Sequence, residues 1–155
     1  ALEMMNPEAW GVETYFREGT RELHLRPYGS GAPGFFLARM PEGTGGDIHH
    51  GFNVLGAGLL REARNRGELI VVDEIGFLEE HCLHYRNELI RCLEGPKPLL
   101  AVLGYRGCWW MEELRGRQDV QMLELEPGNR EEAPARIARL FVNRHEAGTK
   151  GPKKL

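Results

Sequence analysis

Two adjacent carboxylates, Asp73 and Glu74, directly follow a short apolar run, Leu69–Val72. Such a run is typical of a buried parallel strand, and α/β proteins bind their ligands at the carboxyl end of these strands. One carboxylate placed there can help to hold a Mg²⁺ ion, and a second can activate a water molecule. The pair therefore suits the hydrolysis of a nucleotide phosphate.

The same two residues also fit a purely structural role. Asp73 can cap the helix expected to follow, and Glu74 can lie in the solvated first turn of that helix, where negative charge is favourable. The pair alone does not decide between the two interpretations.

Alternating elements are expected to position the acidic pair. After residue 50 the apolar spacing predicts helices and strands in the order α-β-α-β-α-β-α, which indicates a parallel sheet covered on both faces. These elements are expected near residues 55–63, 69–72, 78–93, 98–104, 109–117, 119–125 and 129–141. Asn129 is expected to cap the last helix, with Glu132 completing a capping box.

The segment before residue 50 has a different pattern. Three short alternating runs, at 12–18, 21–28 and 35–40, predict a small antiparallel meander, and 41–51 is expected to be a loop. The predicted fold is therefore α/β, with a three-layer, mostly parallel sheet and the meander near its N-terminus. We expect one domain over 1–145 and a flexible tail over 146–155.

Composition excludes several classes of protein. Twenty basic and 23 acidic residues give a net charge of −3, which does not indicate a nucleic-acid or membrane surface. No apolar run approaches the roughly 18 residues of a membrane helix. Three cysteines, an odd number without a CxxC pair, predict reduced thiols and a cytoplasmic protein.

Other chemistry-bearing groups have simpler explanations. His81, Cys82 and His84 lie close together, but no four-ligand zinc set is visible, and the apolar phase places Cys82 in the core. His49 and His50 fall in the predicted loop. Trp109–Trp110 could form a base-stacking platform, although one buried and one half-exposed ring is the plainer expectation.

The wider string VVDEIGFLEEHCLHY resembles a motif of the thermophile-type nucleoside-triphosphatase family, Asp-Glu-Ile-Gly-x-Met-Glu-Leu-x-Ser-x-x-Phe. The direct matches are Asp73, Glu74, Ile75, Gly76 and Glu79. Leu78 stands where the family has Met, and Tyr85 stands where it has Phe.

Weaker similarity extends over most of residues 11–141. GVETYFREG resembles a Gly-Phe-x-Thr-x-Glu-Val-Arg stretch through Gly11 and Thr14, and Arg17 matches if one position is deleted. Asn129 and Arg130 resemble an Asn-Arg segment near the family's C-terminus. Gly104 departs from the family, which commonly has a His there that could sense phosphate.

This resemblance implies a P-loop NTPase-like fold and Mg²⁺-dependent hydrolysis of ATP, GTP and similar nucleotides. Asp73 would bind the Mg²⁺ shell, and Glu74 would polarise the attacking water. Arg17, Asn129 and Arg130 would line the nucleotide site.

The phosphate-binding loop that such an activity needs is missing from the sequence, which contains no GxxxxGKS or GxxxxGKT. Two carboxylates alone repel a triphosphate, because binding comes from backbone N–H groups, the loop Lys and a helix N-terminus. In the family the loop precedes the stretch that begins at Gly11, and ALEMM resembles the end of a helix, so we expect the loop upstream of Ala1.

A missing loop-bearing strand would leave an apolar trough next to Leu69–Val72, to be covered by that segment or by a partner chain. The alternative is a loop-less, catalytically inactive relative that serves as a regulatory or interaction subunit.

Overall fold

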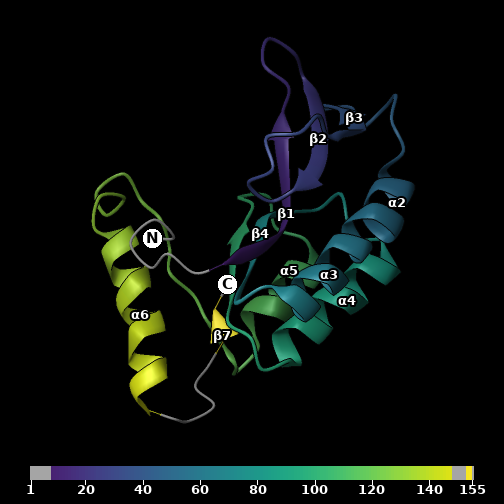
Figure 1. Cartoon of the computed structure of the whole chain (residues 1–155). Helices are drawn as coiled ribbons and strands as arrows, with labels where there is room; N and C mark the ends of the chain where they lie inside the picture. Colours follow the sequence, from purple (N-terminus) through teal and green to yellow (C-terminus); the bar gives the residue numbers. More distant parts are fainter. Residues whose placement is uncertain (1–7, 148–152, 155) are drawn as a thin grey trace.

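The computed structural model describes residues 8–147 and 153–154, and a five-stranded sheet forms its centre (Figure 1). The strands, in chain order, are β1 (Ala9–Phe16), β2 (Glu22–Pro27), β3 (Phe35–Arg39), β4 (Leu69–Ile75) and β5 (Leu99–Leu103). Their order across the sheet is β3-β2-β1-β4-β5.

Strand β4 is an interior parallel strand, as the apolar run predicts. It pairs in parallel with β1, where Val72 lies opposite Val12, and with β5, where Ile70 lies opposite Leu99. Its first four residues are all buried, because successive side chains point to opposite faces and both faces are covered.

The predicted antiparallel meander is also present. Strands β1, β2 and β3 pair antiparallel in sequence, and the parallel pairing of β1 with β4 joins the meander to the rest of the sheet. The prediction of a loop over 41–51 is wrong for its last residues, 48–51, which are helical. Asp47 accepts a hydrogen bond from the His50 N–H at 2.8 Å and so caps a helical segment that begins at Ile48.

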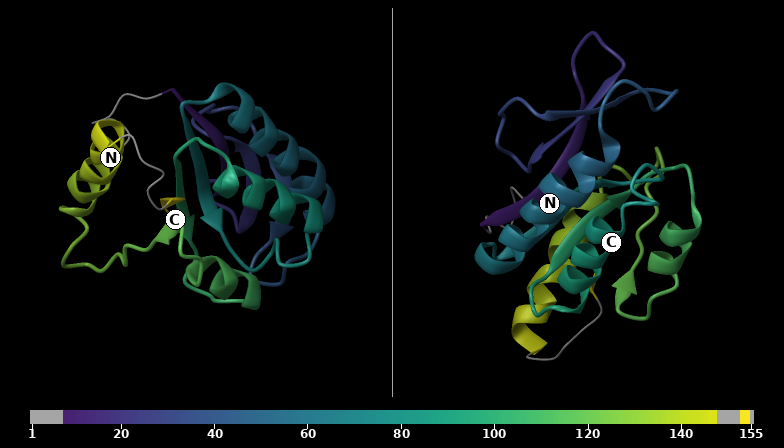
Figure 2. Two further views of the ribbon diagram at one scale, coloured as in Figure 1. Left: turned by 90° about the horizontal axis from the view of Figure 1, so that it is seen from below. Right: turned by 90° about the vertical axis from the view of Figure 1, so that its right-hand side faces the viewer.

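Helices flank the sheet on both sides (Figure 2). Helix α2 (Ile48–His50) runs through a π-helical turn, η1 (Gly51–Gly56), into α3 (Ala57–Arg66). They are followed by α4 (Leu83–Glu94), α5 (Trp109–Arg115) and α6 (Ala133–Ala147). Helix α4 begins at Leu83, later than the predicted start near Leu78. None of the described helices is long and apolar enough to cross a membrane.

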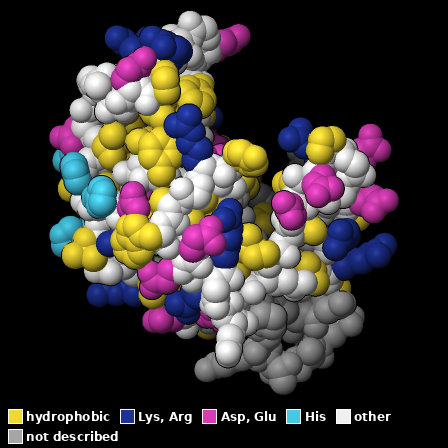
Figure 3. Space-filling model, turned by 180° about the vertical axis from the view of Figure 1, so that it is seen from behind, with side chains coloured by type: hydrophobic (Ala, Val, Ile, Leu, Met, Phe, Trp, Pro, Cys, Tyr) yellow, Lys and Arg dark blue, Asp and Glu magenta, His cyan; other side chains and the backbone are white. Residues whose placement is uncertain are grey.

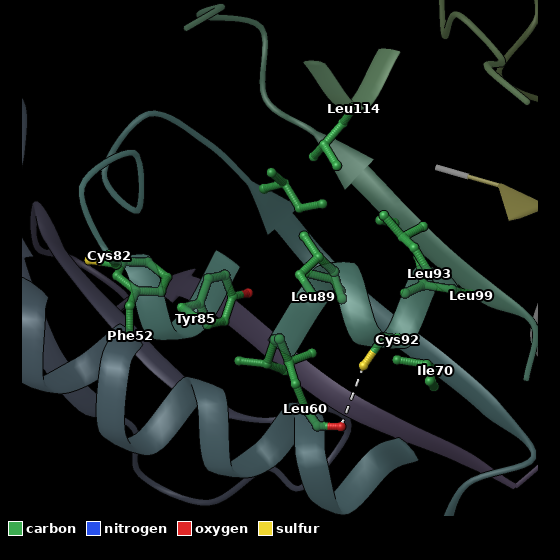
Figure 4. Packing of buried hydrophobic residues seen from close by; sticks show 14 of the residues in the cluster. Phe52, Leu60, Ile70, Cys82, Tyr85, Leu89, Cys92, Leu93, Leu99 and Leu114 are labelled. Atoms are coloured by element: carbon green, nitrogen blue, oxygen red, sulfur yellow. Dashed lines mark hydrogen bonds between the residues drawn. The ribbon is translucent and has the colours of Figure 1, made fainter. Parts of the chain in front are cut away.

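The side chains of β4 divide the core into two clusters. Ile70 and Val72 pack with the residues of α3, α4 and α5 in a large cluster, part of which is shown in Figure 4. In that cluster the thiol of Cys92 donates a hydrogen bond to the Leu60 carbonyl at 3.6 Å. Leu69 and Val71 pack on the opposite face against Phe141 of α6. The predicted covering of both faces is therefore confirmed.

The segment before α6 differs from its prediction. Only Val120–Gln121 (β6) of the strand expected at 119–125 is formed, and it pairs with the two-residue strand β7 (Lys153–Lys154). The Asn129 side chain accepts from the Glu126 N–H and donates to the Glu124 carbonyl, both at 2.9 Å. Both hydrogen bonds of the Asn129 side chain go to the loop before it, so the prediction that Asn129 caps α6 is wrong.

The flexible tail predicted over 146–155 overlaps the end of α6, which extends to Ala147. Residues 148–152 and 155 of that tail, like the opening ALEMM, lie outside the described residues.

The trough expected beside Leu69–Val72 is also wrong, because β1 and β5 occupy both edges of β4. The open edge belongs to β5: within the described part of the chain, no strand is hydrogen-bonded to its far side. Val102 of β5 is 42% exposed, and β7 lies beside this strand. Figure 3 shows a hollow between the segment leading into α6 and the rest of the molecule.

The close approach of β1 to β4 leads to a stability prediction. A Cβ at Gly11 would lie 1.8 Å from the Val71 carbonyl oxygen, which is backbone and cannot turn away. We expect Gly11→Ala to lower the free energy of unfolding by about 3 kcal/mol or more. In α3, Gly58 has nothing within 4 Å of its Cβ position. Gly58→Ala should therefore raise stability, by up to about 1 kcal/mol.

Urea unfolding of both variants checks this. Equal effects of the two substitutions would contradict the β1–β4 register.

Candidate active site

The acidic pair lies at the carboxyl end of β4, where the apolar run predicts it. Asp73 is half-buried and Glu74 is exposed, while Ile75 returns to the core. The pairing register between β4 and β5 shifts between Asp73 and Ile75, so Glu74 stands out of the regular ladder. Irregularities of this kind often redirect a side chain beside an active site.

The helix-capping interpretation of the pair is excluded. The residue that precedes α4 is Cys82, and the turn formed by residues 76–82 separates it from β4. Asp73 therefore lies too far from the first turn of α4 to cap it.

Strand β1 contributes two polar residues to the same edge. Glu13 is the register partner of Asp73, and Thr14 accepts a hydrogen bond from the Glu74 N–H through Oγ1 at 3.4 Å. Glu13 is also ion-paired with Arg26, with 2.6 Å between Oε1 and Nε. The edge thus gathers three carboxylates, one of which already has a cationic partner.

Gly104, directly after β5, makes room for Glu74. Its N–H donates to the Ile75 carbonyl at 2.8 Å, which brings the two chain segments together. A Cβ at this position would lie 2.7 Å from Oε1 of Glu74. The Glu74 carboxylate therefore occupies the space that a side chain at Gly104 would need.

Negative charge is concentrated at this edge of the sheet. Burial raises the pKa of Asp73, and the charge of Glu13 raises it further. Burial and the charge of Asp73 likewise raise the pKa of Glu74. A divalent cation would relieve this concentration of negative charge. Carboxylate oxygens fit Mg²⁺, which takes one or two of them and completes its shell with water and phosphate oxygens.

The predicted nucleotide-binding residues are not gathered around the pair. Arg17 lies in the β1–β2 turn and is ion-paired with Glu22 at 2.9 Å. Asn129 is held by its own loop, and Arg130 is exposed beside it. Among the described residues, no hydrogen bond or ion pair joins any of these three to Asp73 or Glu74.

The remaining candidate groups have structural roles. Cys82 is fully buried, as its apolar phase predicts, and the ring of Trp110 is buried while that of Trp109 is about half exposed. The Arg86 guanidinium lies 4.7 Å from the Trp109 ring centroid. Across the described ranges, no group of three or more His, Cys, Asp or Glu side chains is arranged to hold a metal by itself.

Glu79 is a further carboxyl group close to the pair. It is 2% exposed, in the turn between β4 and α4, and accepts a hydrogen bond from the Gly76 N–H at 2.6 Å. Burial raises its pKa to about 8, against the lowering effect of that hydrogen bond. The carboxyl group is therefore largely protonated at neutral pH.

Sequence reasoning missed the roles of Glu13, Thr14 and Gly104. Thr14 and Gly104 lie in segments that were compared with the family, but the sequence predicted no contact between either residue and Glu74. A signal existed, since residues near the carboxyl ends of neighbouring parallel strands meet at one edge. It could not be used without knowing that β1 lies beside β4.

Comparisons with known proteins agree with this geometry. A family model described as NTPase matches residues 47–138. The nucleoside-triphosphatase THEP1 of Methanosarcina acetivorans is 30% identical over 135 residues, which cover 83% of this chain and 75% of the relative. The crystal structure of THEP1 from the hyperthermophile Aquifex aeolicus has a TM-score of 0.72 at 20% identity, covering 90% of this chain and 87% of that chain. This likeness confirms the predicted fold.

The buried Glu79 predicts a pH-dependent stability. Its folded pKa is about 8 and its ordinary value is 4.5, so the unfolded chain loses this proton first as the pH rises. The stability that the neutral carboxyl contributes is complete below about pH 4.5 and is lost progressively towards pH 8. Glu79→Gln cannot ionise and should escape this loss.

At about 1.4 kcal/mol per pKa unit, the difference in unfolding free energy between Glu79→Gln and the parent should shift in favour of the variant by on the order of 4 kcal/mol. Urea unfolding at pH 4.5, 6 and 8 measures it. A pH-independent difference would show that Glu79 is ionised in the folded protein.

Proposed function

Because the chain belongs to the thermophile-type nucleoside-triphosphatase family of P-loop NTPases, we propose that it takes part in the Mg²⁺-dependent hydrolysis of ATP- and GTP-type nucleotides. The observation that carries this proposal is the placement of Asp73 and Glu74 side by side at the carboxyl end of the interior strand β4. An α/β sheet offers its ligand site at that edge.

The two carboxylates have different roles in this proposal. Asp73, the more buried, would hold Mg²⁺ through its water shell, and the ion would supply positive charge to the phosphate oxygens. Glu74 would accept a proton from the attacking water, a contribution of roughly 10²- to 10⁴-fold in rate. The Thr14 hydroxyl at its N–H and the space at Gly104 keep Glu74 in place. Arg17, Asn129 and Arg130 remain proposed nucleotide contacts.

Phosphate binding requires a loop that the sequence lacks, and the open edge of β5 offers a place for it. A strand added in parallel to β5 would end at the same edge of the sheet as β4, so that a loop following it would face Asp73 and Glu74. An antiparallel strand would carry its loop to the opposite edge. We therefore propose that the phosphate-binding loop follows a strand paired in parallel with β5.

A second function remains as an alternative. The absence of GxxxxGKS and GxxxxGKT from these residues would also fit a loop-less relative that kept the fold and acts as a regulatory or interaction subunit. A cytoplasmic location suits either function, since the structure joins no two of the three cysteines in a disulfide, as expected in a reducing compartment.

Nucleotide binding separates the two functions. The protein expressed from its complete reading frame should bind Mg²⁺–ATP or Mg²⁺–GTP, whereas residues 1–155 alone should not. At a nucleotide concentration about 100-fold above the dissociation constant, stabilisation is roughly 2.7 kcal/mol. For a domain of this size, this raises the melting temperature by roughly 5–10 °C. Glu74→Gln should keep most of that rise and lose phosphate release, while Asp73→Asn should weaken both.

If the melting temperature of the complete protein does not shift with nucleotide and the protein releases no phosphate, the proposed hydrolysis is wrong and the interaction-subunit alternative is the one left to test.

The contact between Gly104 and Glu74 gives a separate prediction. In Gly104→Ala the new methyl group displaces the Glu74 carboxylate, which is the end of a flexible, exposed side chain. Unfolding free energy should therefore change by less than about 1 kcal/mol. The kcat for phosphate release in the complete protein should fall by up to about 100-fold, because the base is misplaced.

Gly107→Ala is the matched control, since its Cβ would make only ordinary contact, 3.5 Å from Oε1 of Glu112. A kcat that falls equally in both variants would show that the loop, rather than the place of Glu74, determines the rate.

A further inference from the structure

Glu79 is buried close to the proposed general base, yet the proposed hydrolysis assigns it no chemistry. Its side chain points back from the turn after β4 and accepts the Gly76 N–H through Oε1 at 2.6 Å. With only 2% of the residue exposed, solvent cannot replace this acceptor. The hydrogen bond is therefore a fixed part of the turn that follows Glu74.

The Gly76 peptide groups are held from both sides. While Glu79 accepts the N–H, the indole Nε1 of Trp110 donates to the Gly76 carbonyl at 3.2 Å. The thiol of Cys108 approaches the same carbonyl at 3.9 Å. Gly76 thus lies between the turn that leads into α4 and the start of α5.

These two hydrogen bonds also restrain the backbone next to Glu74, two residues earlier. A glycine without restraints rotates more freely than any other residue and would let the strand end pivot. Here the Ile75 carbonyl is fixed by the Gly104 N–H, and both polar groups of Gly76 are fixed by Glu79 and Trp110. The backbone on the carboxyl side of Glu74 is therefore restrained at successive peptide groups.

We propose that Glu79 is a positioning residue, which sets the place of the Glu74 carboxylate by bracing the Gly76 peptide; this rests on the proposed role of Glu74 as the general base. The neutral state of Glu79 at pH 7 suits the role, because an ionised carboxylate there would add a further negative charge beside Glu74. Gln at this position keeps the acceptor oxygen and the length of the side chain, whereas Ala removes the acceptor.

The test compares Glu79→Ala, Glu79→Gln and the control Glu80→Gln in the protein expressed from its complete reading frame. Glu80→Gln makes the same chemical change one residue further on, where the carboxylate only approaches His81, at 3.8 Å. We expect Glu79→Ala to lower kcat by about tenfold or more, with KM and the nucleotide-induced melting shift within about twofold of the parent. Glu79→Gln should restore kcat to within about threefold.

Amide hydrogen exchange provides a readout that needs no hydrolysis. In ¹⁵N-labelled protein, exchange at Gly76 and Glu74 should become about tenfold faster in Glu79→Ala, as expected for the loss of one hydrogen bond. It should remain unchanged in Glu79→Gln, and amides of the β1–β2 pair should be unaffected in both. These exchange rates also show whether Glu79→Ala is folded.

The outcomes separate the two proposals. A parent protein that releases no phosphate contradicts the proposed function, and with it this role of Glu79, even where the exchange rates change. A hydrolysing parent with unchanged exchange at Gly76 in Glu79→Ala, or with equal losses of kcat in the Ala and Gln variants, overturns the positioning role alone. Loss confined to Glu79→Ala, in kcat and in exchange together, supports it.

Discussion

The parallel pairing of β4 with both β1 and β5 is the constraint on which the arrangement of this protein depends. It requires Leu69–Val72 to be buried on both faces, so helices must cover the sheet on each side. It also brings the carboxyl ends of three strands to one edge. Glu13 and Thr14 of β1, the acidic pair of β4 and Gly104 after β5 meet there for this reason.

The same constraint concentrates negative charge at the edge where these strands end. Glu13 has Arg26 as its partner, whereas burial raises the pKa of both Asp73 and Glu74. The charge of Glu13 raises the pKa of Asp73 further, and the charge of Asp73 does the same for Glu74. A polyphosphate approaching this edge is repelled unless Mg²⁺ and a basic loop accompany it. In the proposed hydrolysis, the open edge of β5 and the missing phosphate-binding sequence therefore concern one physical requirement, which is to bring positive charge beside β4.

Much of the fold could be predicted because its signals are local. The apolar run at Leu69–Val72 and the spacing of Tyr85, Leu89 and Cys92 depend on burial, which each segment records in its own sequence. The acidic pair could be found for the same reason. Asn129 was misassigned because its side chain bonds to the loop before it rather than to the helix after it, and propensity alone does not distinguish the two. The contacts of Thr14 and Gly104 depend on pairing between segments about 30 or 60 residues from Glu74, which no local pattern contains.

The two faces of the sheet are covered very unequally. On one face, α3, α4 and α5 share a large continuous cluster with Ile70 and Val72; on the other, α6 reaches Leu69 and Val71 through Phe141, with Ile137 beside it. Among the described side chains this layer buries few apolar contacts, and a layer of that kind is expected to open at a lower free energy than the larger cluster. Helix α6 is therefore expected to detach before the sheet and its acidic edge unfold, which would expose one face of β4 transiently without global unfolding.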